Sequence, residues 1–346
     1  MKVLKSMFCM FSILAYAVTS FGSEGGLFLS DPSIGYEVCN LGINRNEVAL
    51  VFTNHAKTAA WVVPCTLRNV SFLVVAGGGG GGADRNKDAN EGGAGGGGGG
   101  VVTGVVSRLN KGDVLSAIVG AGGLGGVSND LYEKGAWSGT TGGNSALCVE
   151  GVEYVVAYGG GGDGGFLMPG KSGGSSAGSR SDKTNDETIA ESVIEATVNT
   201  DYVRTYESFG SLGGTALNVC YLASAGGGGA CGQGFSPISR SQGGNGGEGL
   251  PCDITGELRV YGSGGGGGAS VAQIQAKGGT GAGDGNKARN NESKGIDGDG
   301  FSAPANLGGG GGGGGGEGAN GGNGGSGVVV IRFSNPANGI NIRIVR

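Results

Sequence analysis

Histidine is nearly absent from this sequence, and aromatic residues are scarce. The one histidine, His55, lies in "FTNHAK", which predicts a hairpin turn rather than a Ser/His/Asp site. The carboxylate pairs Glu191/Glu195 and Asp297/Asp299 lie in polar stretches, without the apolar surroundings that raise a carboxyl pKa for acid catalysis. We therefore expect no catalytic residue and no enzyme activity. An exported hydrolase built on His55 is the least favoured alternative.

Metal-ligand spacings are missing as well. No two cysteines stand at C-x-x-C spacing, which argues against zinc. Two Asp/Gly-rich stretches, 284–286 and 297–300, fit neither the twelve-residue calcium loop nor the calcium-binding nonapeptide repeat. We expect no metal and no other cofactor, and assign these stretches to turns.

Long apolar runs are absent after the first residues. Residues 1–17 combine Lys2 and Lys5, an apolar run over 7–15 and an Ala15-Tyr16-Ala17 cleavage site, which together predict a signal peptide; cleavage as late as 22–23 is the alternative. The product is then secreted, on the cell surface or periplasmic, with no later membrane segment. Removing residues 1–17 leaves 21 basic and 28 acidic residues, a net charge of −7. This balance argues against nucleic acid or an anionic membrane as partner.

Cleavage would also reduce the seven cysteines to six, because Cys9 leaves with the signal peptide. An even count in an exported chain suggests up to three disulfides. We expect a Cys39–Cys65 pair within the N-terminal segment and leave the other four unassigned. Partly reduced cysteines are the alternative.

Glycine, in contrast, makes up 86 of the 346 residues. The stretch "GFLMPGKS" (165–172) therefore fits the phosphate-loop template, with Lys171 and Ser172 in the binding positions, far more readily by chance than in an ordinary chain. The following "GGSSAGSRSD" has no helix former and no apolar period, although the template needs a helix there. We expect no nucleotide. Collagen is excluded, because glycine does not recur strictly every third residue.

The glycine runs have a fixed place along the chain. Each follows a strand-like segment, as in "VSFLVVAGGGGGG" (70–82), "YVVAYGGGG" (154–162) and "LRVYGSGGGGG" (258–268). This order argues against a disordered polymer, which is the alternative that the composition suggests. Further strands are expected at 48–53, 59–63, 101–106, 114–119, 328–333 and 340–345. We expect one domain over 24–346.

Two polar stretches interrupt this pattern. Residues 175–208 suggest a surface insertion, either a loop or a short helix plus a strand, with the chain's one helix-like period at 186–198. Residues 283–301 suggest an exposed polar loop.

Ordered glycine needs a physical compensation. Each glycine fixed in regular structure costs roughly 0.5–1 kcal/mol more than alanine and has no side chain to bury. Main-chain hydrogen bonds, at about 0.5–1.5 kcal/mol net each, are the remaining source of stability. Chains without Cβ atoms lie close enough together for extended segments with three residues per turn to bond to several neighbours. We therefore expect a packed bundle of polyglycine II helices.

Three stretches carry a family likeness: 51–82, 92–126 and 311–333, the last being "GGGGGGEGANGGNGGSGVVVIRF". Together they resemble the glycine-rich domain of bacterial exported proteins and phage tail proteins, and more distantly the extracellular glycine-rich region of anaplastic lymphoma kinase and leukocyte tyrosine kinase. The resemblance implies an all-β, β-sandwich-like framework with a polyglycine helix bundle and no enzymatic activity. No partner-contact residue can be transferred from it.

The expected function is a secreted, non-catalytic structural or adhesive module that contacts an extracellular protein or glycan surface. A specific receptor- or glycan-binding module, like a tail-fibre tip or a ligand-binding ectodomain, is the first alternative. Exposed aromatic side chains stack on sugars or anchor interfaces. The candidates for such contacts are Tyr132, Trp137, Tyr202 and Tyr206, for each of which core packing is the alternative.

Overall fold

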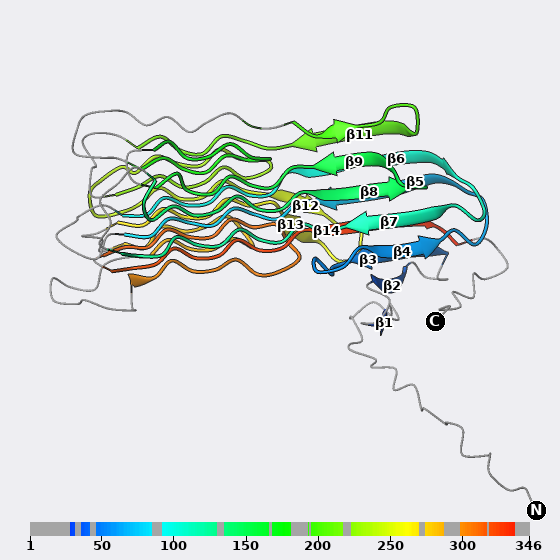
Figure 1. Cartoon of the computed structure of the whole chain (residues 1–346), viewed down its shortest axis with the longest axis horizontal. Helices are drawn as coiled ribbons and strands as arrows, with labels where there is room; N and C mark the ends of the chain where they lie inside the picture. Colours follow the sequence, from blue (N-terminus) through cyan, green and yellow to red (C-terminus); the bar gives the residue numbers. More distant parts are fainter. Residues whose placement is uncertain are drawn as a thin grey trace, which may run out of the picture.

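A computed structural model describes most of the chain after residue 27. The described residues are 28–31, 36–41, 46–84, 92–129, 135–165, 168–180, 193, 195–216, 223–269, 274–286, 298–316 and 318–335. They contain β-strands and extended segments and no α-helix, so the all-β prediction is confirmed. Figure 1 shows strands at one end of the molecule and long side-by-side segments running away from them.

Fourteen strands are present in this part of the chain. They are β1 (Phe28–Asp31), β2 (Tyr36–Leu41), β3 (Glu47–Phe52), β4 (Ala59–Val62), β5 (Leu67–Val75), β6 (Val101–Leu109), β7 (Val114–Ile118), β8 (Ser145–Val149), β9 (Val152–Ala157), β10 (Thr197–Val198), β11 (Val203–Phe209), β12 (Leu250–Cys252), β13 (Arg259–Tyr261) and β14 (Val328–Ser334).

The strands form three antiparallel sheets. The seven-stranded sheet has the order β1-β2-β3-β14-β5-β6-β11, and the five-stranded sheet has the order β10-β9-β8-β7-β4. β12 and β13 form a separate hairpin. β14, from the far end of the family-like region, lies between β3 and β5, with Val330 opposite both Val51 and Leu73. A segment late in the chain thus forms an inner strand between two early strands.

The seven-stranded sheet buries both of its faces. On β5, Phe72 and Val74 enter an apolar cluster that also takes Leu115 and Leu147 from the five-stranded sheet. The alternate residues Leu73 and Val75 enter a second cluster with the β12–β13 hairpin. Side chains on a strand point alternately to opposite faces, so a strand that is covered on both sides needs a continuous apolar run. The sequence "SFLVV" at 71–75 is such a run.

Most expected strands are present, whereas the predictions for the two polar stretches need correction. Strands occur at the predicted places up to 333, while 340–345 lies outside the described residues. Residues 175–180 are buried rather than on the surface, and Val203–Phe209 is an integral edge strand. Most of the helix-like stretch 186–198 lies outside the described part, and its last two residues are the strand β10. The stretch 283–301 was expected to be an exposed polar loop, but its Gly283 and Gly285 are buried among other glycine tracts.

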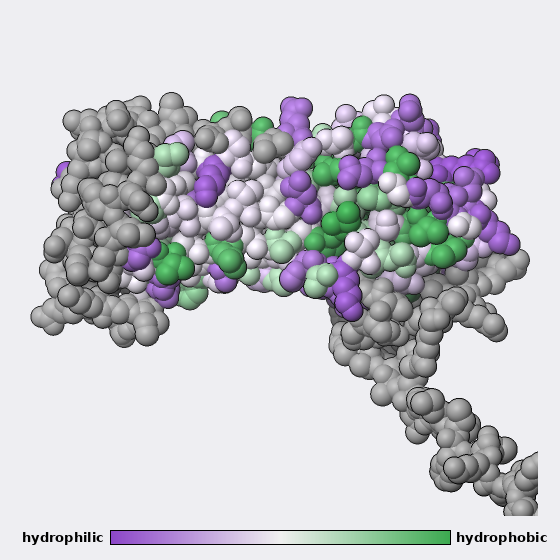
Figure 2. Space-filling model, in the orientation of Figure 1, coloured by the Kyte–Doolittle hydropathy of each residue, from purple (hydrophilic) through white to green (hydrophobic). Residues whose placement is uncertain are grey.

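The surface differs between the two ends of the molecule. In Figure 2 the strand end carries both apolar and strongly polar areas, whereas the glycine segments present a mostly pale surface of intermediate hydropathy. In this view, apolar and strongly polar side chains are scattered singly over the glycine segments.

Candidate functional site: the glycine-tract bundle

The glycine tract 77–82 donates its hydrogen bonds in a repeat of three. Each N–H goes to a carbonyl of a different neighbouring segment from the one before, and every third N–H returns to the same segment. The bonds are Gly77→Gly143, Gly78→Gly325, Gly79→Gly97, Gly80→Thr140, Gly81→Gly322 and Gly82→Ala94, at 2.8–3.0 Å between N and O. The tract therefore donates to three separate segments.

Its carbonyl groups repeat in the same way toward three other segments. They accept from Gly160, Gly123, Gly311, Asp163, Gly126 and Gly314, in order from Gly77 to Gly82. The tract thus bonds to six neighbours, whereas a β-strand bonds to at most two. All of its donors and acceptors are paired, as buried main chain requires.

Two further tracts are bonded in the same way. The N–H groups of 95–100 reach the segments 225–228, 308–311 and 158–161 in turn, and those of 310–315 reach 263–266, 79–82 and 298–301. These two tracts also bond to each other and to 77–82, through Gly79→Gly97, Gly96→Gly311 and Gly311→Gly79. The three tracts together form the centre of the bundle.

Only glycine fits these central positions. A Cβ atom on Gly79 would lie 2.1 Å from the carbonyl oxygen of Gly161, and one on Gly81 would lie 2.1 Å from that of Gly312. The obstructing atoms are main chain, which cannot rotate away. The glycine runs are thus a steric requirement of close chain packing.

Outer segments complete their bonding with side chains. Hydroxyl and amide oxygens at the edge of the bundle accept N–H groups that have no neighbouring carbonyl. Thr140 Oγ1 accepts from Leu124 at 2.7 Å, and Asn323 Oδ1 accepts from Gly125 at 2.8 Å. Asn320 Oδ1 likewise accepts from Ser128 at 2.9 Å. The Ser, Thr and Asn residues between the glycine runs therefore satisfy the bundle's edge, a role that the sequence alone did not suggest.

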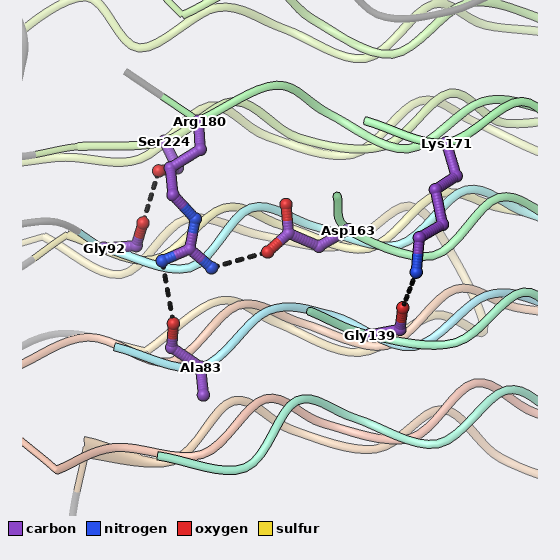
Figure 3. A network of polar contacts seen from close by, with 7 residues as sticks. All are labelled: Ala83, Gly92, Gly139, Asp163, Lys171, Arg180 and Ser224. Carbon is purple, nitrogen blue, oxygen red and sulfur yellow. Dashed lines mark hydrogen bonds and ion pairs between the residues drawn. The ribbon is translucent and has the colours of Figure 1, made fainter. Parts of the chain in front are cut away.

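Charged groups also lie inside the bundle (Figure 3). Arg180 donates from Nη2 to Asp163 Oδ2 at 2.5 Å and from Nη1 to the carbonyl of Ala83 at 2.8 Å, and both side chains are fully buried. The guanidinium carbon lies 5.9 Å from the centre of the Trp137 ring, within cation–π range. Ser224 Oγ bonds to the carbonyl of Gly92 in the same region. These contacts join six segments of the chain through side chains.

The phosphate-loop-like stretch is part of this packing. Lys171 Nζ donates to the carbonyl of Gly139 at 2.7 Å, and its main-chain N–H donates to Gly162 (Figure 3). The described residues from Ser172 to Arg180 are extended, with no helix after the motif. The lysine is therefore used to link two tracts.

The predicted aromatic contacts do not form one site. Trp137 is buried, in agreement with the core-packing alternative, and its Nε1 donates to Asn129. Tyr202 and Tyr206 are 42% and 46% exposed, as expected, and Tyr202 stacks on Tyr154 with ring centres 4.4 Å apart. Tyr132 lies outside the described residues.

The expected Cys39–Cys65 disulfide is wrong, because both thiols are free. Cys39 packs in the cluster under the β12–β13 hairpin, whereas Cys65 packs against the cluster between the two large sheets. The seven-stranded sheet separates them. Burial, together with the nearby charge of Glu37, raises the pKa of the Cys39 thiol to about 12.

The remaining candidates lie apart from one another. His55 lies in an exposed turn, as predicted, and Glu195 lines a cavity of about 350 Å³ with Tyr158 and Ser208. Within the described ranges, no three His, Cys, Asp or Glu side chains come close enough to hold a metal ion. The same ranges include no helix with the length and apolarity of a membrane span.

Comparison with known families gives one match. A family model described as a glycine-rich domain covers residues 53–334. No curated protein matches the chain. The matched range begins after β3 and ends with the last residue of β14, so it contains the whole bundle.

Proposed function

Since this chain belongs to the family of glycine-rich domains, we propose that it is a secreted, non-catalytic structural or adhesive module at a cell surface. Its glycine tracts would act as a rigid scaffold that presents the connecting segments to an extracellular protein or glycan. The signal-peptide pattern of residues 1–17 supports export. The resemblance to exported bacterial and phage tail proteins supports a role in surface contact.

One observation carries the proposal, namely the three-residue repeat of hydrogen bonds to six neighbours. A β-strand bonds on two sides only, so this repeat favours the polyglycine II conformation, which has three residues per turn. The apolar cluster shared by the two large sheets favours a β-sandwich-like framework at its base. A bundle bonded on all sides resists bending, which suits display at a distance.

Amide hydrogen exchange tests the scaffold directly. We expect the N–H groups of 77–82, 95–100 and 310–315 to exchange only by large-scale unfolding, whereas those of the exposed turn 55–57 exchange rapidly. Exchange of the three tracts as fast as that of the turn would show a flexible polymer and reject the scaffold.

A specific binding module is the second candidate, favoured by the exposed Tyr202 and Tyr206. Binding to a glycan array or to host cells should be lost in Tyr202→Ala/Tyr206→Ala and retained in Phe235→Ala, which also removes an exposed aromatic ring. Unchanged binding in the double variant would remove these tyrosines from the contact surface. An exported hydrolase, the third candidate, predicts activity that His55→Ala abolishes.

A further inference from the structure

One outer tract carries a regular row of exposed apolar side chains. From the end of β7 onward, exposure recurs every third residue, at Ile118, Ala121, Leu124 and Val127. Leu124 and Val127 are 65% and 68% exposed, and Ile118 is 42% exposed. We call these four residues the apolar ridge. In an extended conformation with three residues per turn, its members stand about 9 Å apart on one side of the tract.

The neighbours of the ridge are known from the hydrogen bonds. The tract lies on 77–82, to which Gly123 and Gly126 donate. It is flanked on one side by 140–143 and on the other by 321–327. The ridge therefore points away from the bundle, at the middle of a face made by three tracts.

This face has no charged residue of its own. Residues 118–129, 136–145 and 318–327 include no Asp, Glu, Lys, Arg or His. Two charged side chains reach them from other segments, Lys171 at Gly139 and Asp299 at Asn320. Soluble proteins usually place charges on surfaces that must stay apart. A neutral face with an apolar row is unusual in a chain of net charge −5.

We propose that this face is a contact between two copies of the chain, arranged about a two-fold axis. The inference rests on the proposed scaffold, which gives the ridge its regular spacing. Another copy is the occupant that has the same spacing and the same lack of charge, while other faces of two acidic molecules repel. An axis midway between Ala121 and Leu124 places each Leu124 on the small Ala121 of the partner copy. It also brings each Val127 opposite Ile118.

The size of the face sets the strength of the contact. Ten residues at about 3.1 Å each, across three tracts about 4.8 Å apart, give roughly 450 Å² for each copy. Stable dimers bury about 800 Å² per partner. The association is thus weak, with a Kd in the micromolar to millimolar range, and it persists in high salt because no ion pair holds it.

Sedimentation equilibrium of the full chain tests this at protein concentrations from about 10 μM to 1 mM. We expect the average mass to rise above the monomer value of 33.6 kDa in 0.5 M salt. Leu124→Glu should abolish the rise, since it places a charge on the ridge. Ile238→Glu, a matched change at a residue that is 86% exposed on another segment, should leave it intact.

A mixing experiment tests the arrangement itself. Leu124→Glu and Ala121→Lys variants should each stay monomeric. Their mixture should restore a heterodimer, because the introduced carboxylate of one variant then faces the introduced ammonium group of the other across the axis. A wild-type chain that stays monomeric at 1 mM, a Leu124→Glu variant that still dimerises, or a mixture that stays monomeric would overturn the proposal. The scaffold is judged separately, since tract protection in hydrogen exchange does not depend on dimer formation.

Discussion

Arg180 and Asp163 form an ion pair at 2.5 Å in the interior of a bundle that otherwise consists mostly of bare main chain. Glycine tracts are nearly identical every three residues, so main-chain bonds alone permit a tract to slide by three positions and bond again. A side-chain contact between Arg180, Asp163 and the Ala83 carbonyl forms at one alignment only. The pair therefore specifies the alignment of the tracts that it joins.

Arg180→Met should destabilise the protein strongly. It leaves the Asp163 carboxylate buried without its cation, and removing one member of a buried pair costs about 3–5 kcal/mol. Chemical denaturation measures the loss. Arg259→Met is the matched control, because the Arg259–Glu257 pair is half exposed and contributes about 1 kcal/mol or less. Equal effects of the two substitutions would contradict the role of the buried pair.

Removing both charges separates stability from alignment. In Arg180→Met/Asp163→Leu no unpaired charge remains, so we expect most of the lost free energy to return. If the pair specifies alignment, the double variant should nevertheless show more than one set of amide resonances for 77–82. A single set, identical to that of the wild type, would assign the alignment to other contacts.

Gly79→Ala should prevent normal folding. Its Cβ would lie 2.1 Å from a main-chain oxygen, so two tracts must separate and several hydrogen bonds must break. Gly112→Ala is the control, because no atom lies within 4 Å of its Cβ position and only its positive φ of 95° is strained. That strain costs about 1–2 kcal/mol. Thermal unfolding of both variants provides the test. A Gly79→Ala variant as stable as Gly112→Ala would contradict the steric requirement.

The sequence predicted the strands well because their apolar runs are local signals. "SFLVV" and "VVVIRF" are each buried on both faces, and no other structure suits them. Residues 175–180 were predicted on the surface and are buried. Their partners, Ala83 and Asp163 for Arg180, come from distant tracts. In a chain with so few side chains, no local pattern indicates which tract lies beside which.

Ser145 connects both large sheets to the bundle, and its loss should be costly. Its buried Oγ accepts from the Gly120 N–H at 2.8 Å and donates to the Val75 carbonyl at 2.7 Å. Ser145→Ala leaves both groups unpaired away from water, at about 1–3 kcal/mol. Thr140→Ala removes a comparable but exposed bond, which water replaces, so we expect less than about 1 kcal/mol. Urea unfolding midpoints compare the two, and a larger loss in Thr140→Ala would contradict this account.

The buried Cys39 thiol should make stability fall in alkaline solution. Its pKa is raised to about 12 in the folded protein, whereas an unfolded cysteine titrates near about 8.5. Below about pH 8.5 both states carry the proton and stability is unaffected. Between about pH 8.5 and 12 the unfolded state loses its proton first, so the free energy of unfolding decreases by up to about 1.4 kcal/mol per pH unit.

Cys39→Ala isolates this effect from the tyrosines and lysines that titrate in the same range. We expect the wild type to lose about 2 kcal/mol more than Cys39→Ala between pH 8 and pH 10, from the slope of about 1.4 kcal/mol per unit. Cys231→Ala, at an exposed thiol, should keep most of the wild-type dependence. Parallel pH curves for wild type and Cys39→Ala would contradict the prediction. They would mean that the Cys39 thiol has its ordinary pKa in the folded protein, so that the β12–β13 hairpin does not shield it from water.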